Sequence, residues 1–489
     1  PADASPRHMD AARELRLPLS RVLEREITIQ TGNEPAPEAY RFLVGFPAPD
    51  DRQPLGTEES RWRILPTETY FYGDDEDNHR GTQHAVYGFL EEQLGIRWIA
   101  PGEDGMVYRH QESLRLTAGD FRWQPKLVFR KIRQSIRRDQ PHRPIGAPYT
   151  DPFLLSVEEH NRRVQDEELW QKRMRMGGSR PGGGHAFSAW WEKYGKDHPE
   201  YFALSKFGRR EPVPMAKPEQ TASFVKICPS NPGVADQLIA DWLPRKDRIR
   251  YVNAGVNDGT RNFCECPSCR ALDVTLPDES WQDHLTDRYV HLANAVAVQA
   301  REHRPDAFAT LYAYLTTLQP PRRLRLEPNI VVHLVPYVDP LDLDTVTRHF
   351  EGWKQAGATQ LARRPNYHHK YLTTALPLGI ERRMFDVFQA AVANGCISAD
   401  YDSAMGHWAV SGMTDYILAR ALAQPDQPFE RWEAEYLEAF GAAGAQVAEF
   451  FHYWRKEVWE ARLAPAIDTI CEAGRAGNFA RGLMWNLES

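Results

Sequence analysis

The stretch of residues 250–269, RYVNAGVNDGTRNFCECPSC, constrains the fold more than any other part of the chain. An apolar run ends in a polar turn that contains Asn257, Asp258 and Gly259, and a C-x-C-x-x-C group follows. A buried strand that ends in this way is typical of an α/β barrel, where it delivers a carboxylate to the rim. The stretch therefore predicts a barrel strand, with further strands elsewhere in the chain to close the barrel.

Apolar runs and helical patterns alternate through the middle of the chain. Besides the strand before Asn257, we expect strands at 127–132, 225–228, 308–315, 330–335, 359–362 and 396–399, and one more near His185. Helices are expected at 151–176, 233–243 and 286–303. Such alternation implies βαβ units and a parallel sheet. About eight strands favour a (β/α)8 TIM-like barrel over an open doubly wound sheet, since no glycine-rich phosphate loop follows the first strand.

The segments on either side of the barrel have patterns of their own. Before it, strands are expected at 27–31, 40–46 and 96–99, a hairpin or one long strand at 61–72, and a helix at 81–95 that ends at Gly95. After it, helical patterns cover 413–423, 429–440 and 444–462. At 489 residues the chain is too long for one core. We predict an N-terminal α/β domain at 1–122, the barrel at 123–410 and a C-terminal helical region at 411–489, which packs on the barrel or forms a homodimer contact.

Two parts of the chain resemble known families. The string GTQHAVYGFLEEQLGIRWIAPGEDG, residues 81–105, resembles the N-terminal domain of bacterial alpha-glucuronidases and related exo-glycosidases, where this domain supports the barrel. Residues from about 125 to 440 resemble an uncharacterised bacterial domain family, domain-of-unknown-function family 4838. The strings HPEYFAL, ICPSNP, NDG with CxCxxC, and YILARAL carry this second resemblance. It implies a glycosidase-like architecture and no specific reaction.

Polar and aromatic residues follow the expected strands, where a barrel carries its active site. Aromatic faces stack on the C–H surfaces of sugars and polar groups read hydroxyls, so this set suits a carbohydrate. The candidate substrate-binding residues are His185, Trp190, Asn257, Tyr312, Tyr314, Tyr337, Tyr367 and His368.

Glycoside hydrolysis needs one carboxylic acid to protonate the leaving oxygen and a second group opposite it. We assign the acid to Asp258, and the base or nucleophile to Asp402 or Asp400, which follow the last strand. The strand of Asp258 occupies about the position where alpha-glucuronidases and beta-hexosaminidases place their acid. Beta-hexosaminidases have an acidic pair there, whereas this chain has Asn257 before Asp258. The alternatives are a turn residue at 258 and helix-cap or turn carboxylates at 400 and 402.

The cysteines at 264, 266 and 269 form a local site. Three thiolates at this spacing reach one tetrahedral zinc, and Cys228 supplies a fourth ligand from a neighbouring strand end. We expect a structural zinc bound by Cys228, Cys264, Cys266 and Cys269. The alternatives are a disulfide within the loop, favoured by export, and a catalytic thiol.

The leading hypothesis is an exo-acting glycoside hydrolase that needs no cofactor for catalysis and acts on a polysaccharide or oligosaccharide. The arginine-rich segments 130–138 and 173–180 favour a uronic acid or sulfated sugar if they reach the pocket, because arginine binds planar anions. Two alternatives are a carbohydrate-binding barrel without catalysis and a metal-dependent hydrolase that uses His185, His368 and cysteine ligands.

Composition limits the other classes of protein. A formal net charge of −7 argues against a general nucleic-acid binder, which needs a basic surface. No stretch approaches the roughly 20 apolar residues of a membrane span. The chain opens PADASPRHMD, without an initiator methionine, so a periplasmic or extracellular location is expected if its N-terminus was processed.

Overall fold

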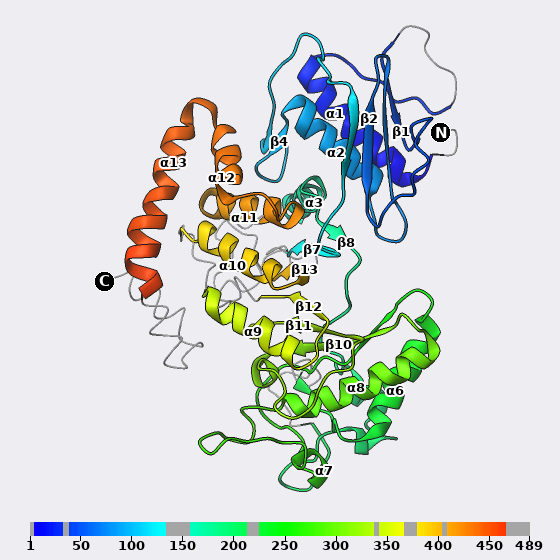
Figure 1. Ribbon diagram of the computed structural model, residues 1–489, viewed down its shortest axis with the longest axis vertical. Coiled ribbons are helices and arrows are strands. Elements are labelled where there is room, and N and C mark those ends of the chain that lie inside the picture. Colours follow the sequence, from blue (N-terminus) through cyan, green and yellow to red (C-terminus); the bar gives the residue numbers. More distant parts are fainter. Residues whose placement is uncertain are drawn as a thin grey trace. The chain divides into compact units, whose positions relative to one another are not determined.

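The computed structural model describes residues 4–32, 39–133, 157–212, 224–336, 342–365, 379–402 and 408–465. The chain divides into two compact units. Figure 1 colours the chain by residue number. The first comprises Pro1–Arg180, His368–Phe385 and Ser403–Ser489, and the second comprises Pro181–Tyr367 and Asp386–Asp402. The division into three domains at residues 122 and 410 stays a prediction.

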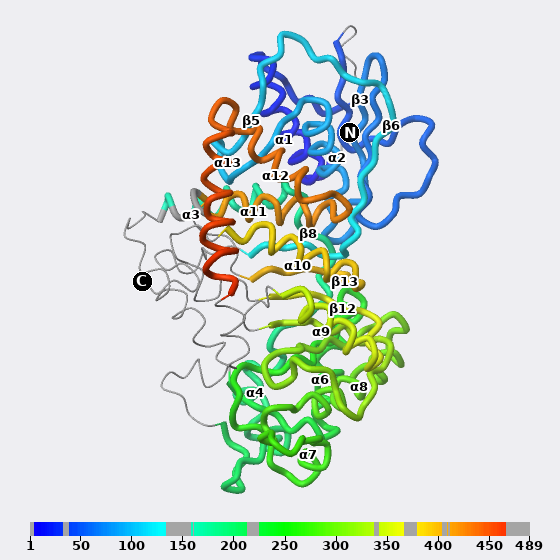
Figure 2. Tube along the Cα trace, turned by 60° about the vertical axis from the view of Figure 1, so that its left-hand side comes forward, coloured from blue at the N-terminus to red at the C-terminus, as the bar shows by residue number. Residues whose placement is uncertain are grey.

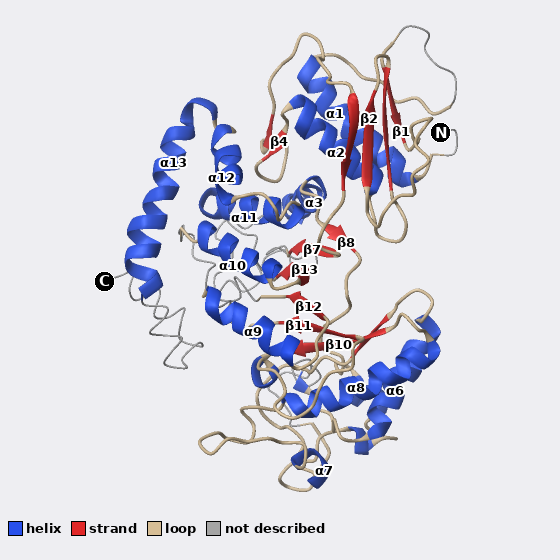
Figure 3. Cartoon of the chain, in the orientation of Figure 1, coloured by secondary structure: helices blue, strands red, loops and turns tan. Residues whose placement is uncertain are grey.

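The first unit begins with a four-stranded sheet in the order β1-β3-β2-β6. Its strands are β1 (Arg41–Val44), β2 (Ser60–Ile64), β3 (Glu68–Gly73) and β6 (Gly119–Trp123), and α1 (Pro6–Leu23) and α2 (Gly81–Leu94) pack against it (Figure 3). Of the hairpin and the long strand considered for 61–72, the structure has the hairpin, formed by antiparallel β2 and β3. Gly95 ends α2 as predicted, because its φ of 67° suits glycine and its amide donates to the Leu90 carbonyl. Residues 27–31, expected as a strand, have no regular structure.

The rest of the first unit is mainly helical. Figure 2 shows the C-terminal helices following one another along the chain. The helices are α3 (Val157–Arg173), α11 (Trp408–Ala423), α12 (Phe429–Glu438), the 3-10 turn η4 (Gly441–Ala443), α13 (Gly444–Tyr453) and the π-helical Trp454–Leu463. Two short antiparallel pairs accompany them, β4 (Arg97–Trp98) with β5 (Met106–Val107), and β7 (Phe129–Ile132) with β8 (Gly177–Gly178). The three expected C-terminal helices are therefore present, the last of them as α13 and the π-helix.

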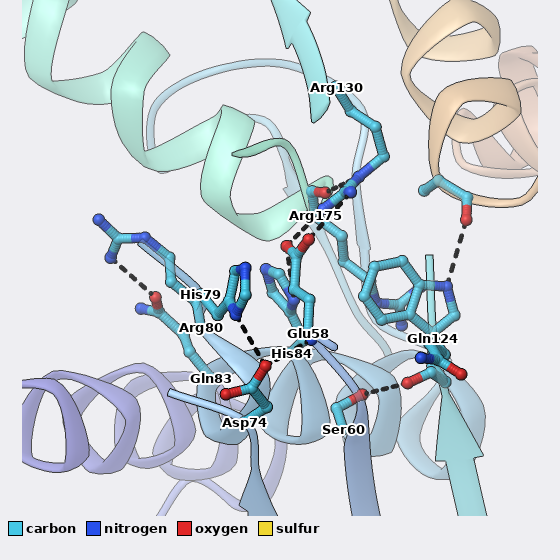
Figure 4. A network of polar contacts seen from close by, with 12 residues as sticks. Glu58, Ser60, Asp74, His79, Arg80, Gln83, His84, Gln124, Arg130 and Arg175 are labelled. Carbon is cyan, nitrogen blue, oxygen red and sulfur yellow. Dashed lines mark hydrogen bonds and ion pairs between the residues drawn. The ribbon is translucent and has the colours of Figure 1, made fainter. Parts of the chain in front are cut away.

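Buried charges stabilise the interior of the first unit (Figure 4). Both carboxylate oxygens of Glu58 accept from Arg130, at 2.5 and 3.1 Å, and Arg130 also donates to the Arg175 carbonyl at 2.9 Å. The carboxylate of Glu91 accepts from Arg175 and Arg420, at 2.6 Å each. Arg130 and Arg175 come from the two arginine-rich segments, so both are used inside this unit.

The second unit contains five parallel strands, each beside its neighbours in sequence. They are β9 (Tyr251–Asn253), β10 (Phe308–Ala313), β11 (Ile330–Leu334), β12 (Gln360–Arg363) and β13 (Cys396–Tyr401). The helices are α4 (Trp190–Tyr194), α6 (Pro232–Trp242), α7 (Pro267–Arg270), α8 (Thr286–His303), α9 (Leu343–Gln355) and α10 (Glu381–Ala393). Three 3-10 turns complete it: η1 (Pro199–Tyr201), η2 (Leu243–Arg245) and η3 (Leu315–Thr317). The expected helices at 233–243 and 286–303 are confirmed as α6 and α8, the first capped by the Asn231 side chain.

The described residues confirm a mixed α/β fold but not a closed (β/α)8 barrel. The expected strand at 225–228 is reduced to one bridge, between Ile227 and Phe202. Near His185 no strand forms, because Gly182, Gly183 and Gly184 have φ values of 68°, 98° and 124°, far from those of a strand. The expected first barrel strand, β7, pairs antiparallel with β8. No helix in the described stretches is long and apolar enough to cross a membrane.

Candidate active site

The five parallel strands of the second unit end at one edge, where polar side chains gather. Parallel strands bring their carboxyl ends together, so residues far apart in sequence meet there. The residues at these ends are Asp258 after β9, Tyr312 and Tyr314 at the end of β10, His333 in β11, Arg364 after β12, and Asp400 and Asp402 at the end of β13.

A glycine loop brings His185 to this edge. A Cβ atom on Gly183 would lie 2.8 Å from a ring carbon of Tyr312 and 3.2 Å from Nε2 of His333, so no larger residue fits. The positive φ at this position also favours glycine. The rings of Tyr312 and Tyr314 lie 6.2 and 6.5 Å from the imidazole of His185, measured between centroids.

His185 and Asp258 form a pair that shares one proton. Nδ1 of His185 donates to the Val256 carbonyl at 2.8 Å, and Nε2 lies 3.3 Å from Oδ2 of Asp258. Because Nδ1 already carries its hydrogen, a contact between Nε2 and the carboxyl group requires a second proton on one of the two. His185 and Asp258 are about one-third exposed, at 32% and 36% of their side chains.

The surroundings of His185 and Asp258 favour the ion pair, in which His185 carries the shared proton and Asp258 is ionised. Burial opposes the imidazolium, but the hydrogen bond and the charge of Asp258 outweigh burial and raise the pKa of His185. Burial likewise opposes the carboxylate, yet the hydrogen bond and charge of His185, the charge of Lys226 and a hydrogen bond from Tyr314 lower the pKa of Asp258. Both shifts favour an imidazolium beside a carboxylate.

Lys226 holds the turn that carries Asp258. Its buried ammonium donates to the carbonyls of Asn257 at 2.7 Å and Gly259 at 3.0 Å, and also to the carbonyl of Asp258. Burial lowers the pKa of Lys226 to about 7, while the charge of Asp258 acts in the opposite direction. Three carbonyls fix one ammonium, so the backbone position of Asp258 depends on Lys226.

A second carboxylate at the same edge is bound to arginine. Asp402 accepts from Arg364 at 2.8 Å, and the guanidinium lies 5.7 Å from the centre of the Tyr312 ring. The charge of Arg364 also reaches His185, whose pKa it lowers as a minor contribution. The edge thus combines His185, Asp258, Arg364 and Asp402 around buried tyrosines.

Comparison with known proteins gives the family of this chain. The model of the family described as Domain of unknown function (DUF4838) matches residues 101–452, which is more than half of the chain. The chain belongs to the DUF4838 family. The resemblance of residues 125–440 to this family, inferred from the sequence, is thereby confirmed. No curated protein matches the chain.

Solved structures similar to this DUF4838 chain include glycoside hydrolases. The GH20 beta-N-acetylhexosaminidase of Streptomyces coelicolor A3(2) is 12% identical, with a TM-score of 0.45 over 90% of this chain and 91% of that one. A family 89 glycoside hydrolase of Clostridium perfringens is 12% identical, with a TM-score of 0.44 over 94% of this chain and 53% of that one. A GH138 enzyme described as targeting pectin rhamnogalacturonan II is 12% identical, with a TM-score of 0.44 over 94% of this chain and 68% of that one.

Several expected substrate-binding residues of the DUF4838 chain are buried. Trp190 is 6% exposed and packs among the rings of Phe187, Tyr194 and Tyr201, so it serves the core. Asn257 is 2% exposed, and its amide oxygen accepts from the amide of Phe187 at 3.0 Å, which ties the segment after His185 to the turn.

The other expected site residues fall into two groups. Tyr312, Tyr314 and Asp400 are buried at the strand ends, beside the edge. The remaining three expected residues, Tyr337, Tyr367 and His368, lie outside the described residues.

Sequence reasoning missed three residues of this site. They are Lys226, His333 and Arg364. Arg364 is the first residue after β12, so the search for polar residues that follow an apolar run, which selected Asp258, could also have found Arg364. His333 looked like part of an apolar strand, and its Nε2 contact with the Pro181 carbonyl, at 3.1 Å, joins residues 152 positions apart.

The four cysteines of the C-x-C-x-x-C region come together in the second unit. Cys228, Cys264, Cys266 and Cys269 are buried free thiols whose sulfur atoms all lie within 4.8 Å of one another. Such a cluster could hold a metal ion.

Proposed function

We propose that this chain is a glycoside hydrolase whose reaction takes place at the carboxyl edge of the second unit. The observation that carries the proposal is the 3.3 Å contact between Nε2 of His185 and Oδ2 of Asp258, whose side chains are about one-third exposed. Glycoside hydrolysis requires a proton donor beside the leaving oxygen and a carboxylate near the anomeric carbon. The similar glycoside hydrolase is only 12% identical to this chain, so the proposal is based on this geometry and not on that similarity.

The shared proton suggests how the bond breaks. It passes from the His185–Asp258 pair to the glycosidic oxygen while the bond from this oxygen to the anomeric carbon breaks. The positive charge that develops on the sugar is stabilised by Asp402, whose orientation is supported by Arg364. Water then bonds to the anomeric carbon and its proton returns to the pair, which restores the starting state.

This mechanism changes the role first expected for Asp258. A carboxylic acid that donates its own proton needs a raised pKa, but the pKa of Asp258 is lowered. We therefore assign the proton to the pair, with His185 as its resting carrier. The proposed substrate is a polysaccharide or oligosaccharide that is cleaved from one end. Substrates that contain a uronic acid or a sulfated sugar are included in this proposal.

The lowered pKa of Asp258 also favours the second candidate, a carbohydrate-binding protein without catalysis. An ionised carboxylate and an arginine can hold sugar hydroxyls without breaking a bond. The metal-dependent hydrolase has less support, because the four cysteines lie within reach of one another and leave no open position for water on a shared ion.

The experiment is sugar release from uronides, hexosaminides, fucosides and sulfated oligosaccharides by wild type, Asp258→Asn and His185→Gln. We expect each variant to lower kcat by about 10²-fold or more, the usual contribution of a positioned proton donor. The loss should be smaller for nitrophenyl glycosides than for natural sugars, since nitrophenolate leaves without protonation.

Asp306→Asn is the matched control. Asp306 is a 58% exposed carboxylate at the opposite end of the sheet, just before β10. Its replacement should leave kcat unchanged. Turnover by wild type that survives in both site variants would refute the proposed proton donor, and sugar binding without any turnover would select the non-catalytic candidate.

A further inference from the structure

The cysteine cluster has the dimensions of a tetrahedral metal site. Zinc–sulfur bonds of about 2.3 Å place the sulfurs of a tetrahedral site about 3.8 Å apart. Sγ of Cys228 lies 3.6 Å from Sγ of Cys266 and 3.6 Å from Sγ of Cys269, and Cys264 completes the group within 4.8 Å. All four side chains are at most 7% exposed, and no buried carboxylate or histidine belongs to the group in the described residues.

The surroundings of the cluster suit thiolates. The amide of Leu204 donates to Sγ of Cys264 at 3.2 Å, and the amide of Cys269 donates to Sγ of Cys266 at 3.4 Å. The guanidinium of Arg210 hydrogen-bonds to Cys228 and lies near the two cysteines of the C-x-C pair. A zinc ion bound by four thiolates carries a net negative charge. Hydrogen-bond donors and a cation near the sulfurs stabilise such a centre.

We propose that Cys228, Cys264, Cys266 and Cys269 bind one zinc ion, and that this centre fixes the turn of Asp258. Four thiolates select zinc over hard cations such as magnesium and calcium. Because the four sulfurs fill the tetrahedral positions, the ion has no site for water and its role is structural.

The connection between the zinc site and the turn runs through a short segment. Lys226, which binds the three carbonyls of the turn, is two residues before Cys228. Its ammonium lies 4.9 Å from the ring centre of Phe263, the residue before Cys264. Binding of an ion by Cys228 and Cys264 therefore holds Lys226 from both sides, and Lys226 in turn holds Asp258.

The first test is metal analysis of the purified full chain, with a count of free thiols after denaturation in a chelator. We expect about one zinc per chain and all six thiols of the sequence. A metal-free protein in which four thiols are missing would show that the four cysteines form two disulfides and bind no zinc. Bound iron in place of zinc would also overturn the assignment.

Variants localise the ion. Cys266→Ser should lose the zinc, whereas Cys396→Ser, which removes a buried cysteine on β13, should retain it. To separate loss of the ion from unfolding of the loop in Cys266→Ser, wild type is also stripped with a chelator and reloaded with cobalt. Thiolate-to-cobalt charge-transfer absorption is expected, and its absence would refute a four-thiolate site.

The second test follows His185 by NMR titration and needs no substrate. Zinc removal should release Asp258 and let the pKa of His185 fall toward its ordinary value of about 6.5. Lys226→Met should cause the same fall while the zinc stays bound. An unchanged pKa in both samples would refute the coupling and leave the zinc site intact, and neither result depends on whether the chain hydrolyses sugars.

Discussion

At the scale of single residues, the hydrogen bonds that His185 already makes decide which of its atoms faces Asp258. Nδ1 of His185 is committed to the Val256 carbonyl, so only Nε2 faces Asp258. Two interacting groups titrate as a pair, and the proton belongs to both. This arrangement makes the pair sensitive to pH in a direction that follows from the pKa shifts.

We expect the pair to stabilise the protein within a limited pH window. The pKa of His185 is raised, so its contribution is fully present below about pH 6.5 and is lost as pH rises through the folded value. The pKa of Asp258 is lowered, so its contribution is present above about pH 3.9 and is lost as pH falls further. The difference in Tm between wild type and His185→Gln should shrink as the pH rises above about 6.5. His291→Gln, an exposed histidine on α8, should show no such trend, and a constant difference for His185→Gln would contradict the ion pair.

The glycine loop gives a second residue-scale prediction. Gly183→Ala should lower the stability of the second unit and displace Tyr312, because its Cβ would lie 2.8 Å from that ring. Gly184→Ala is the comparison, since its φ is also positive but its Cβ would approach nothing closer than 3.7 Å. We expect Gly183→Ala to cost more by on the order of 1 to 3 kcal/mol in urea unfolding. Equal costs would show that backbone strain alone explains the three glycines.

At the scale of elements, α3 and α11 carry buried carboxyl groups. Burial raises the pKa of Glu167 on α3 to about 8, and it raises the pKa of Asp415 on α11 well above its ordinary value. Asp415 also accepts from the Ser411 hydroxyl at 3.2 Å, and Glu167 acts on it as a nearby like charge. Glu167 is therefore largely neutral in the folded protein at pH 7.

Glu167→Gln tests the cost of this burial. The folded pKa of Glu167 lies above the unfolded value of about 4.3, so unfolding releases a proton and stability falls between about pH 4.3 and pH 8. The amide removes this dependence, and we expect a gain of roughly 4 to 5 kcal/mol at pH 8 and none at pH 4. Unfolding in urea at both pH values measures it. Glu158→Gln, exposed on the same helix, should show little difference between them, and a pH-independent effect of Glu167→Gln would contradict the raised pKa.

At the scale of the molecule, the buried network of the first unit contains charged side chains that lie away from solvent and neutralise one another. Arg130 is fully buried and depends on Glu58 for its charge partner. Glu58→Gln should destabilise the first unit by about 3 to 5 kcal/mol, because an uncompensated charge stays buried. Asp426→Asn breaks an exposed pair with Lys126 and should cost less than about 1 kcal/mol. Hydrogen exchange should confine the effect of Glu58→Gln to the first unit; similar costs for both variants would contradict this account.

Local patterns predicted many elements correctly. The helix at 286–303 depends on the spacing of its apolar residues, and the helix before Gly95 on such spacing and on its C-terminal glycine, so both could be predicted from neighbouring residues. The strand expected near His185 failed because glycine identity alone does not reveal a positive φ. The closed barrel is not confirmed for a related reason. Which strands pair depends on contacts between segments that are far apart in the sequence, and local patterns do not show these contacts.

The amino-acid sequence by itself determined the α/β class, the strand that precedes Asp258, the four cysteines and the family resemblance, because each depends on residue type and short spacing. Only the tertiary structure decided that Trp190 and Asn257 are buried, that His185 faces Asp258 and that Lys226 holds its turn. The physical reason is that burial and hydrogen-bond partners depend on which distant segments meet. The contact between residues 185 and 258 crosses 73 positions of the chain, and no local pattern encodes it.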